Sequence, residues 1–343
     1  MTLVSEALRI KSNIANAYAS AEGKGATLPD VQNSDNLAEC IDSITGGGGS
    51  GGSAAKYGLN LGSILGELDE NGVLQPPSEE SELVFKGMVK GISGSFPIHF
   101  LEGNTNITGV HFSDLEEVEK TDERGNFLYQ SLNAYNGVSK IKSVSFPKLK
   151  RVVNNIGNGF NFIVGSFDYL PELSGELAFP ELEEIINAYC RGFYSAKFTK
   201  VSFPKLKRLK GMYAEIYYYD LREVTSVDFS SLEEIERSLW DSDYKIRLAY
   251  FYKLTTLSFP KLSKLQGKIK FEYAGLTNLY FNSLKSDSFG SYTNVFNNML
   301  QGVTGCTVHF PSNLEEKLST WSDVTAGFGG TDTIILFDLE PTE

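Results

Sequence analysis

The chain has few of the two side chains that most often build metal and redox sites. It contains three cysteines and three histidines in 343 residues. Cys40, Cys190 and Cys306 are odd in number and widely separated, and no CxxC pair occurs. This pattern indicates neither a disulfide framework nor a zinc site. We expect buried free thiols and no bound metal.

The motifs of common catalytic sites are missing as well. The sequence has no HExxH motif, no GK[ST] phosphate loop and no GxSxG elbow outside the glycine-rich stretch at 45–53. His111 and His309 occupy the same position of a repeated phrase described below, where other copies carry serine, alanine, aspartate or tyrosine. We therefore interpret both histidines as solvated surface residues. The sequence predicts a non-enzymatic protein without catalytic residues, metal or cofactor.

Long apolar runs and an excess of positive charge are absent too. No apolar stretch approaches the ~18 residues that a membrane-spanning helix needs. The N-terminal segment is amphipathic and lacks the hydrophobic block of a secretory signal. A formal net charge of −12 would repel a polyphosphate partner. We expect neither membrane insertion nor nucleic-acid binding.

The sequence does contain an internal repeat, which is the strongest single indicator of its architecture. A nine-residue phrase recurs with an apolar residue, a phenylalanine, a leucine and a second apolar residue at fixed places. Its full copies are VHFSDLEEV (110–118), VSFPKLKRV (144–152), LAFPELEEI (177–185), VSFPKLKRL (201–209), VDFSSLEEI (227–235) and LSFPKLSKL (257–265). Weaker copies are LYFNSLKSD (279–287) and VHFPSNLEE (308–316). The anchor phenylalanines, 22 to 34 residues apart, are Phe112, Phe146, Phe179, Phe203, Phe229, Phe259, Phe281 and Phe310.

Each copy has the alternation of a short strand that ends in a turn. Val144 and Phe146 lie two residues apart and point to the same side, while Ser145 points to the other side. Pro147 lacks an N–H group and fixes φ, which ends the strand. One such coil cannot bury its apolar side alone, whereas stacked coils can. The repeat therefore predicts a solenoid with a continuous core.

The charges of successive copies alternate in sign. The charged residues, copy by copy, are Asp114, Glu116 and Glu117, then Lys148, Lys150 and Arg151, then Glu181, Glu183 and Glu184, then Lys205, Lys207 and Arg208, then Glu233 and Glu234, then Lys261 and Lys264. In a parallel stack equivalent positions are neighbours, so alternation pairs opposite charges, each pair contributing roughly 0.2–1 kcal/mol. We interpret the neighbouring carboxylates as part of this solvated ladder and not as catalytic acids.

The repeated phrases resemble the BspA-like leucine-rich repeats of bacterial and phage surface proteins, over residues 110 to about 320. Proteins of that group are solenoids used for attachment. The resemblance implies a repeat protein of the α+β class, with a leucine-rich-repeat β-solenoid of about 8–9 irregular coils over residues 57–343. The first part, 57–109, would cap the solenoid, with a degenerate copy at Leu83–Phe85. The last part, 321–343, would close the other end, with a strand at Ile334–Phe337.

The N-terminal segment has a different pattern. Apolar or small residues follow heptad spacing, which predicts a helix that docks on another chain or oligomerises; they are Leu3, Ala7, Ile10, Ile14, Ala17 and Ala21. A second helix is expected at 34–44. A self-contained hairpin without a partner is the alternative for this module, residues 1–45. Residues 46–56 are rich in glycine and serine and predict a flexible tether.

Further phrases resemble tail-associated proteins of phages and prophages of gut bacteria. These phrases are KGATLPDVQNSDNLAECIDSI (24–44), YGLNLGSILGELDENGVLQPP (57–77) and WSDVTAGFGGTDTIILFD (321–338). The resemblance implies a virion protein in which residues 1–45 contact other tail proteins. It also implies that the protein is made in the host cytoplasm and released by lysis.

Aromatic residues gather in the second half of the repeat region. Nine of the 17 tyrosines fall between Tyr213 and Tyr280. Tyrosine combines a flat apolar ring with a hydrogen-bonding tip, which suits glycan or protein recognition. The candidate ligand-binding residues are Tyr213, Tyr217, Tyr218, Tyr219, Trp240, Tyr244, Tyr250 and Tyr252. The alternative is that these rings fill the interior of irregular coils.

The sequence therefore predicts an attachment, or receptor-binding, protein of a phage or prophage tail. Its expected partners are a bacterial surface glycan or protein, other tail proteins, and further copies of itself through the N-terminal module. One alternative is a bacterial adhesin located at the cell surface. The other is a hydrolase of cell-wall glycan, which requires two carboxylates facing each other across a cleft.

Overall fold

The computed structural model describes only part of the chain. The described residues are Tyr18, 67–68, 74–75, 82–85, 90–91, 108–120, 141–154, 160–163, 172–192, 196–236 and 244–341. The chain divides into two compact units, Met1–Tyr57 and Gly58–Glu343. In the first unit only Tyr18, a buried helical residue, is described. The predicted tether at 46–56 lies outside the described residues, as do the heptad positions Leu3, Ala7, Ile10, Ile14, Ala17 and Ala21.

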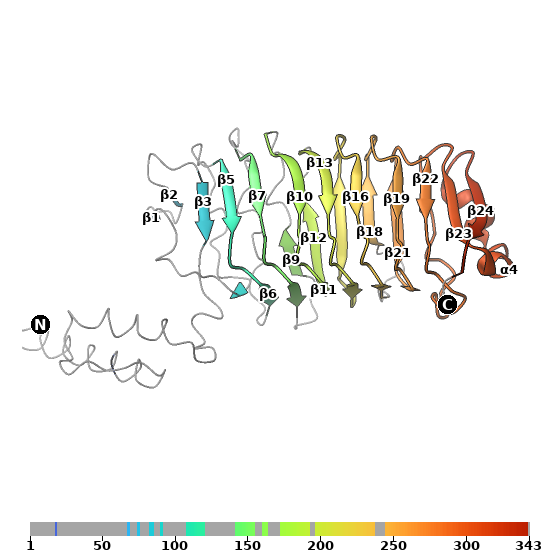
Figure 1. Ribbon diagram of the computed structural model, residues 1–343, viewed down its shortest axis with the longest axis horizontal. Coiled ribbons are helices and arrows are strands. Elements are labelled where there is room, and N and C mark those ends of the chain that lie inside the picture. The colour runs from blue at the N-terminus through green and yellow to red at the C-terminus, as the bar shows by residue number, and fades with distance from the viewer. Residues whose placement is uncertain are drawn as a thin grey trace, which may run out of the picture. The chain divides into compact units, whose positions relative to one another are not determined.

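The second unit is a parallel β-solenoid with little helix, which confirms the predicted stacking of coils (Figure 1). A full coil crosses three faces in turn, as β13 (Lys197–Ser202), β14 (Arg208–Lys210) and β15 (Glu215–Tyr219) show. β16 (Ser226–Asp228) then starts the next coil beside β13. The strands stay parallel because every coil runs in the same direction around the core.

The first face carries the strands of the repeated phrase. Its strands are β3 (Glu82–Phe85), β5 (Gly109–Phe112), β7 (Ser143–Ser145), β10 (Ser174–Ala178), β13, β16, β19 (Thr256–Ser258), β22 (Asn278–Tyr280), β23 (Thr307–Pro311) and β24 (Ile334–Leu339). They form three hydrogen-bonded sheets, β3-β5-β7, β10-β13-β16 and β19-β22-β23-β24. β7 lies next to β10 and β16 next to β19, so the face continues across both breaks (Figure 1).

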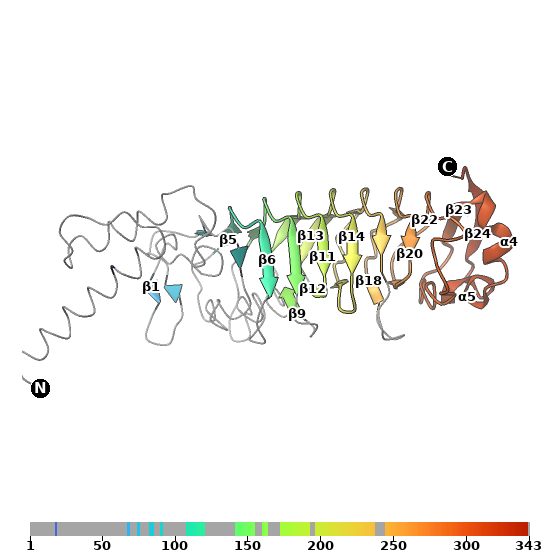
Figure 2. The ribbon, with the colours of Figure 1, turned by 90° about the horizontal axis from the view of Figure 1, so that it is seen from below.

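The other two faces follow the turn at the end of the phrase. The second face consists of β4 (Lys90–Gly91), β6 (Glu117–Lys120), β8 (Arg151–Asn154), β11 (Glu184–Ile186), β14, β17 (Glu234–Ile235) and β20 (Lys264–Leu265). The third face consists of β9 (Phe160–Ile163), β12 (Ala188–Gly192), β15, β18 (Tyr244–Ala249) and β21 (Lys268–Glu272). Figure 2 shows the second-face strands side by side. These seven strands correspond to about six complete turns.

The described ends of the second unit differ from its middle. β1 (Glu67–Leu68) and β2 (Leu74–Gln75) pair antiparallel. At the other end lie η2 (Ser312–Leu314), α4 (Glu315–Leu318), α5 (Ser322–Thr325) and η3 (Gly327–Gly329). Phe328 from this segment packs on Phe310 of the last repeat copy. β24 pairs with β23, which confirms the strand expected at Ile334–Phe337.

The anchor phenylalanines form one continuous file through the core. Adjacent ring centroids are 5.1 to 5.7 Å apart, with interplanar angles of 3° to 14°. Every ring of the file is at most 1% exposed. The spacing follows from the ~4.8 Å separation of neighbouring strands, which leaves the rings offset-stacked. The file also spans both breaks of the first face, so the core is continuous where the hydrogen bonding is not.

The predicted charge ladder is present on the outside of the turn and second face. Arg151 lies between Glu117 and Glu184, with N–O distances of 3.1 and 3.4 Å. The further pairs of the ladder are Lys148–Asp114, Lys150–Glu116, Lys205–Glu181, Lys207–Glu183, Arg208–Glu184 and Lys264–Glu234. The ladder is thus confirmed for these pairs, whereas no ion pair joins the predicted members Glu233 and Lys261 to it among the described residues.

The phenylalanine file makes a strong prediction for stability. Phe203→Ala should lower the free energy of unfolding by about 4 kcal/mol, because a truncated core ring leaves a cavity. The rings of Phe179 and Phe229, at 5.1 and 5.6 Å, are held by their own strands and cannot collapse into it. Denaturant unfolding followed by circular dichroism measures the change. Tyr252→Ala, at a side chain 49% exposed, is the control and should cost less than about 0.5 kcal/mol. A loss below about 1 kcal/mol at Phe203 would contradict a rigid file.

The charge ladder predicts a salt-dependent effect. Arg151→Glu places three carboxylates in a row and should destabilise the fold by about 1–2 kcal/mol. In 1 M salt most of this loss should vanish, because the screening length falls to about 3 Å. The control is Lys142→Glu, since Lys142 is 63% exposed and 3.8 Å from Glu172. Equal losses in the two variants, or a loss that salt leaves unchanged, would argue against the ladder.

Candidate functional site

Tyrosine side chains gather on one flank of the solenoid, where the third face turns back toward the first. β15, β18 and β21 run in parallel there (Figure 1). Residues at equivalent places in successive coils therefore lie side by side. We call four tyrosines of this region the tyrosine shelf: Tyr219, Tyr250, Tyr252 and Tyr273.

The shelf rings hold one another in place. The Tyr250 ring packs edge-on against Tyr219, with 4.8 Å between centroids, and stacks on Tyr273 at 5.1 Å. It also meets the edge of Tyr252 at 6.0 Å. A hydrogen bond with Tyr219 raises the pKa of the Tyr250 hydroxyl, which ties the two side chains together. The outer rings face solvent, with Tyr252 49% and Tyr273 41% exposed.

The backbone beneath the shelf is unusual. The residue that directly follows β15, β18 and β21 has a positive φ, which is 61° at Asp220, 63° at Tyr250 and 50° at Tyr273. Gly302, with φ 74°, takes the equivalent place in the next coil. The backbone N–H of each of the first three donates to a carbonyl of the following coil, at 2.8 to 2.9 Å. These bonds fix the direction in which each side chain leaves the turn.

A cluster of charged side chains lies beside the rings. Glu272 accepts hydrogen bonds from Arg247 Nε at 2.5 Å and from Lys270 Nζ at 2.7 Å. The Arg247 guanidinium lies 4.7 Å from the centre of the Tyr217 ring, and Lys270 Nζ lies 5.1 Å from the centre of the Tyr244 ring. Both contacts have the geometry of a cation–π interaction. The cluster thus joins the strands β15, β18 and β21 on their outer side.

Burial and ion pairing shift the pKa values of Arg247 and Glu272 in opposite directions. Burial lowers the pKa of Arg247, but the hydrogen bond to Glu272 and the neighbouring negative charges outweigh it and raise that pKa. Burial raises the pKa of Glu272, but hydrogen bonds from Arg247 and Lys270 and their charges lower it overall. Arg247 and Glu272 are therefore both charged at neutral pH, and each supplies the counter-charge of the other.

The sequence-predicted site residues occupy different environments. Tyr219, Tyr250 and Tyr252 belong to the shelf, and Tyr217 and Tyr244 cover the charged cluster. Tyr218 is fully buried and stacks on Phe203 at 6.4 Å. Because strand side chains alternate, the middle tyrosine of three must point inward, so Tyr218 is a core residue and not part of the surface.

Two further predicted residues lie away from the shelf. Tyr213 is half-buried and packs edge-on against Tyr189 at 5.7 Å. Trp240 lies outside the described residues. Sequence reasoning missed Tyr273, Arg247 and Glu272 as site residues. A usable signal exists, because Tyr250 and Tyr273 precede the anchors Phe259 and Phe281 by nine and eight residues.

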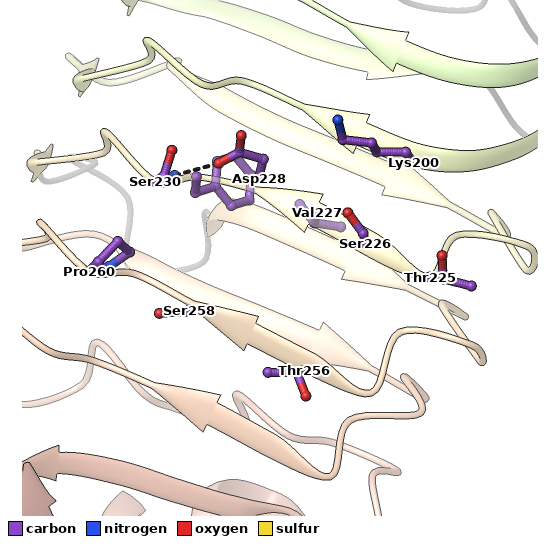
Figure 3. Close-up of a pocket in the computed structure, with 10 residues that line it drawn as sticks. Lys200, Thr225, Ser226, Val227, Asp228, Ser230, Thr256, Ser258 and Pro260 are labelled. Carbon is purple, nitrogen blue, oxygen red and sulfur yellow. Dashed lines mark hydrogen bonds between the residues drawn. The ribbon is translucent and has the colours of Figure 1, made fainter.

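A second surface feature is a groove of about 500 Å³ on the first face, where hydrogen bonding stops between β16 and β19 (Figure 3). We call it the hydroxyl groove; its lining includes Thr225, Ser226, Ser230, Thr256 and Ser258. Its charged groups are engaged within the chain, since Lys200 pairs with Glu176 at 2.9 Å and Asp228 accepts the Ser230 N–H at 2.8 Å. The groove offers no exposed aromatic ring, so the tyrosine shelf is the better candidate.

The histidines of the repeat are less solvated than the sequence indicates. His111 is half-buried, with its Nδ1 2.8 Å from Ser145 Oγ. His309 is only 12% exposed, because its ring stacks on Tyr280 at 4.3 Å and its Nδ1 lies 3.0 Å from Asp338. Both histidines are therefore less exposed than predicted. In a parallel stack the side chains of the two adjacent coils cover much of each outward side chain.

The thiols of Cys190 and Cys306 are buried and free, as predicted, whereas Cys40 lies outside the described residues. Burial raises the pKa of Cys190 to about 12 and that of Cys306 to about 11, so neither is a reactive thiolate at neutral pH. In the described parts of the chain, no group of histidine, cysteine, aspartate and glutamate side chains is arranged to hold a metal ion. No described helix is long and apolar enough to cross a membrane.

The charged cluster predicts a pH-dependent stabilisation. Glu272→Gln should lower the free energy of unfolding by about 3 kcal/mol at pH 7, because it leaves Arg247 and Lys270 without their counter-charge. Because the pKa of Glu272 is lower in the folded chain than its ordinary 4.5, its contribution is full above that value. The contribution is then lost as the pH falls through the lowered pKa.

Denaturant unfolding of wild type and variant across pH 2.5–7 tests this effect, and the two curves should converge at the acid end. Glu223→Gln is the matched control, since its pair with Lys253 is about half exposed, at 47% and 55%, and should contribute less than about 1 kcal/mol. A difference between wild type and Glu272→Gln that is independent of pH would exclude the ionised carboxylate as its cause.

Comparison with known proteins gives no match for this chain. No family model, no curated protein and no solved structure is similar enough to be matched to it. What the chain does must therefore be inferred from its own residues and their arrangement.

Proposed function

We propose that this chain is a non-enzymatic attachment protein, a receptor-binding component of a phage or prophage tail that contacts a bacterial surface component. The observation that carries the proposal is the tyrosine shelf, a rigid aromatic surface on the flank of a solenoid. Tyrosine supplies a large amphipathic contact area at low conformational cost, since only two side-chain torsions must be fixed. The shelf rings are already fixed by one another before any ligand arrives.

We further propose that the solenoid is of the BspA-like leucine-rich-repeat type and has about 8–9 coils. The file of eight phenylalanine rings supports this number, together with the strand β3 that precedes it. The repeated phrase supports the repeat type, because its phenylalanine, leucine and final apolar residue are all buried in copy after copy. Repeat architectures of this kind provide long surfaces for partners.

The remaining parts of the chain have roles that fit attachment. Residues 1–45 dock on other tail proteins or join copies of the chain. Residues 46–56 act as a flexible linker that lets the solenoid move away from this module. Several weakly binding heads held on one particle bind a surface far more tightly than a single head does. The function therefore requires only a modest affinity from each shelf.

A non-enzymatic role is supported by the engagement of the carboxylates described above. Glu116, Glu117, Glu183, Glu184 and Glu234 each lie against a lysine or arginine of a neighbouring coil. A general acid must lie within hydrogen-bond reach of the substrate, whereas these carboxylates are already engaged by side chains of the chain itself. A wall hydrolase would need its acid pair elsewhere.

The attachment proposal is tested by the binding of fluorescently labelled full-length protein to intact cells of a panel of gut bacteria. We expect saturable binding to some strains. The Tyr219→Ala/Tyr252→Ala/Tyr273→Ala variant should bind those strains at least about tenfold more weakly, because interface energy concentrates in a few aromatic residues. The matched control is Ser226→Ala/Thr256→Ala in the hydroxyl groove, which should bind like the wild type.

Three results would contradict the proposal. The first is undiminished binding by the tyrosine variant, and the second is saturable binding to no strain. The third is release of soluble sugar from purified cell walls, which would favour a hydrolase. Immunodetection in a strain that carries the gene separates the remaining alternative: we expect the protein in sedimented phage particles after prophage induction, whereas an adhesin would stay on intact cells.

A further inference from the structure

Tyr250 and Tyr273 occupy backbone positions that do not suit tyrosine. A positive φ is uncommon for residues other than glycine, asparagine and aspartate, and it strains the backbone of a larger residue. The equivalent positions in the coils on either side carry Asp220 and Gly302, which tolerate this conformation. The turn itself therefore does not require tyrosine. Strain that the fold does not need is typical of ligand-contacting positions.

Glycines of the neighbouring coils allow a close approach at both exposed tyrosines, to the ring of Tyr273 and to the backbone of Tyr252. A Cβ atom on Gly302 would lie 2.3 Å from the Tyr273 ring, so only glycine allows this ring its place. A Cβ atom on Gly275 would lie 2.0 Å from the backbone oxygen of Tyr252. The Tyr273 ring thus rests on bare backbone of the next coil, and Gly275 lets the next coil approach the Tyr252 backbone closely. Both rings keep an exposed face, since Tyr252 is 49% and Tyr273 41% exposed.

The charges around the shelf neutralise one another. Arg222 Nε donates to Asp220 at 2.5 Å, and Lys253 pairs with Glu223 at 2.5 Å. Arg247 and Lys270 share Glu272, as described above. These four cations of the described flank therefore each have a carboxylate partner. A charged ligand would have to break one of these pairs, whereas an uncharged ligand would not.

The exposed apolar area is small. Among the described residues of this flank, the large apolar side chains more than one-third exposed are Tyr252 and Tyr273. A stable protein–protein interface buries about 800 Å² on each partner around an apolar centre, and two aromatic rings do not supply that centre. Two rings do match the size of one or two sugar rings.

We propose that the tyrosine shelf binds an uncharged saccharide, with the C–H faces of the sugar on the rings of Tyr252 and Tyr273. The C–H groups carry partial positive charge and meet the negative face of each aromatic ring. Arg222 is 63% exposed and lies 5.8 Å from the centre of the Tyr252 ring, so it donates hydrogen bonds to hydroxyl oxygens of the sugar. Asp220 accepts hydrogen bonds from hydroxyl groups of the sugar. This assignment rests on the proposed function, because it names the ligand class of the same surface.

The experiment is calorimetric titration of the full chain with neutral tetrasaccharides of glucose, galactose, mannose or N-acetylglucosamine. Tetragalacturonic acid serves as the charged counterpart. We expect at least one neutral tetramer to bind and the acid not to bind. Tyr252→Ala/Tyr273→Ala should weaken binding at least about tenfold, because both stacking surfaces are lost.

The conservative variant Tyr252→Phe/Tyr273→Phe is the matched control. It keeps the ring faces and should retain binding within about threefold, since the hydroxyls point away from the stacking surface. Circular dichroism and thermal unfolding verify that both variants fold like the wild type. Loss of binding in the phenylalanine variant as large as in the alanine variant would overturn stacking as the mode of recognition.

The outcomes separate this assignment from the attachment proposal. If the chain binds intact bacteria but no neutral tetramer, the saccharide assignment fails and attachment stands. If the acid binds in place of the neutral sugars, the charge argument fails. If the alanine variant still binds a neutral sugar as the wild type does, the saccharide site lies elsewhere. If neither cells nor sugars bind, both proposals fail.

Discussion

Backbone hydrogen bonding between successive coils sets the spacing on which every other feature of the solenoid depends. Parallel strands lie ~4.8 Å apart, so any side chain placed once per coil meets its own equivalent at nearly that distance. Inside, this spacing stacks the phenylalanines at 5.1 to 5.7 Å. Outside, it brings Arg151 between Glu117 and Glu184. On the flank it seats the Tyr250 ring on that of Tyr273. One geometric constraint thus produces the core, the charge ladder and the candidate site.

The first face and the charge ladder could be predicted because their information is local and repeated. The phrase around Phe146 contains a strand, its proline stop and the return of Leu149 to the interior within a few residues. The third face could not be predicted in the same way. Its strands lie a variable distance after the phrase, and their inward positions accept Cys190, Ile216, Tyr218 or Phe271 without a common type. Strands of four to six residues are too short to be recognised from their alternation alone when no repeated motif lies at a fixed distance from them.

The candidate site was only partly predictable for a related reason. An excess of tyrosine in a sequence marks the region, and the alternation of strand side chains explains why Tyr218 points inward. The partners that give the region its chemistry come from different coils. Arg247 and Glu272 are 25 residues apart, and their contact follows from the register between β18 and β21. Likewise, the positive φ shared by Tyr250 and Tyr273 becomes visible only when the coils are aligned by their backbone.

The turn that follows β15, β18 and β21 carries one outward side chain per coil that takes no part in the core. Its left-handed residue is held by a backbone N–H, which any amino acid other than proline supplies, and its side chain lies outside the phenylalanine file. Aspartate, tyrosine and glycine already occupy this place in neighbouring coils. A substitution at one of these places would change the outer surface of the flank and leave the phenylalanine file untouched. Its cost falls on the local backbone and is smallest for glycine, asparagine and aspartate, which tolerate a positive φ. The outer surface can therefore differ from coil to coil while the interior keeps one pattern.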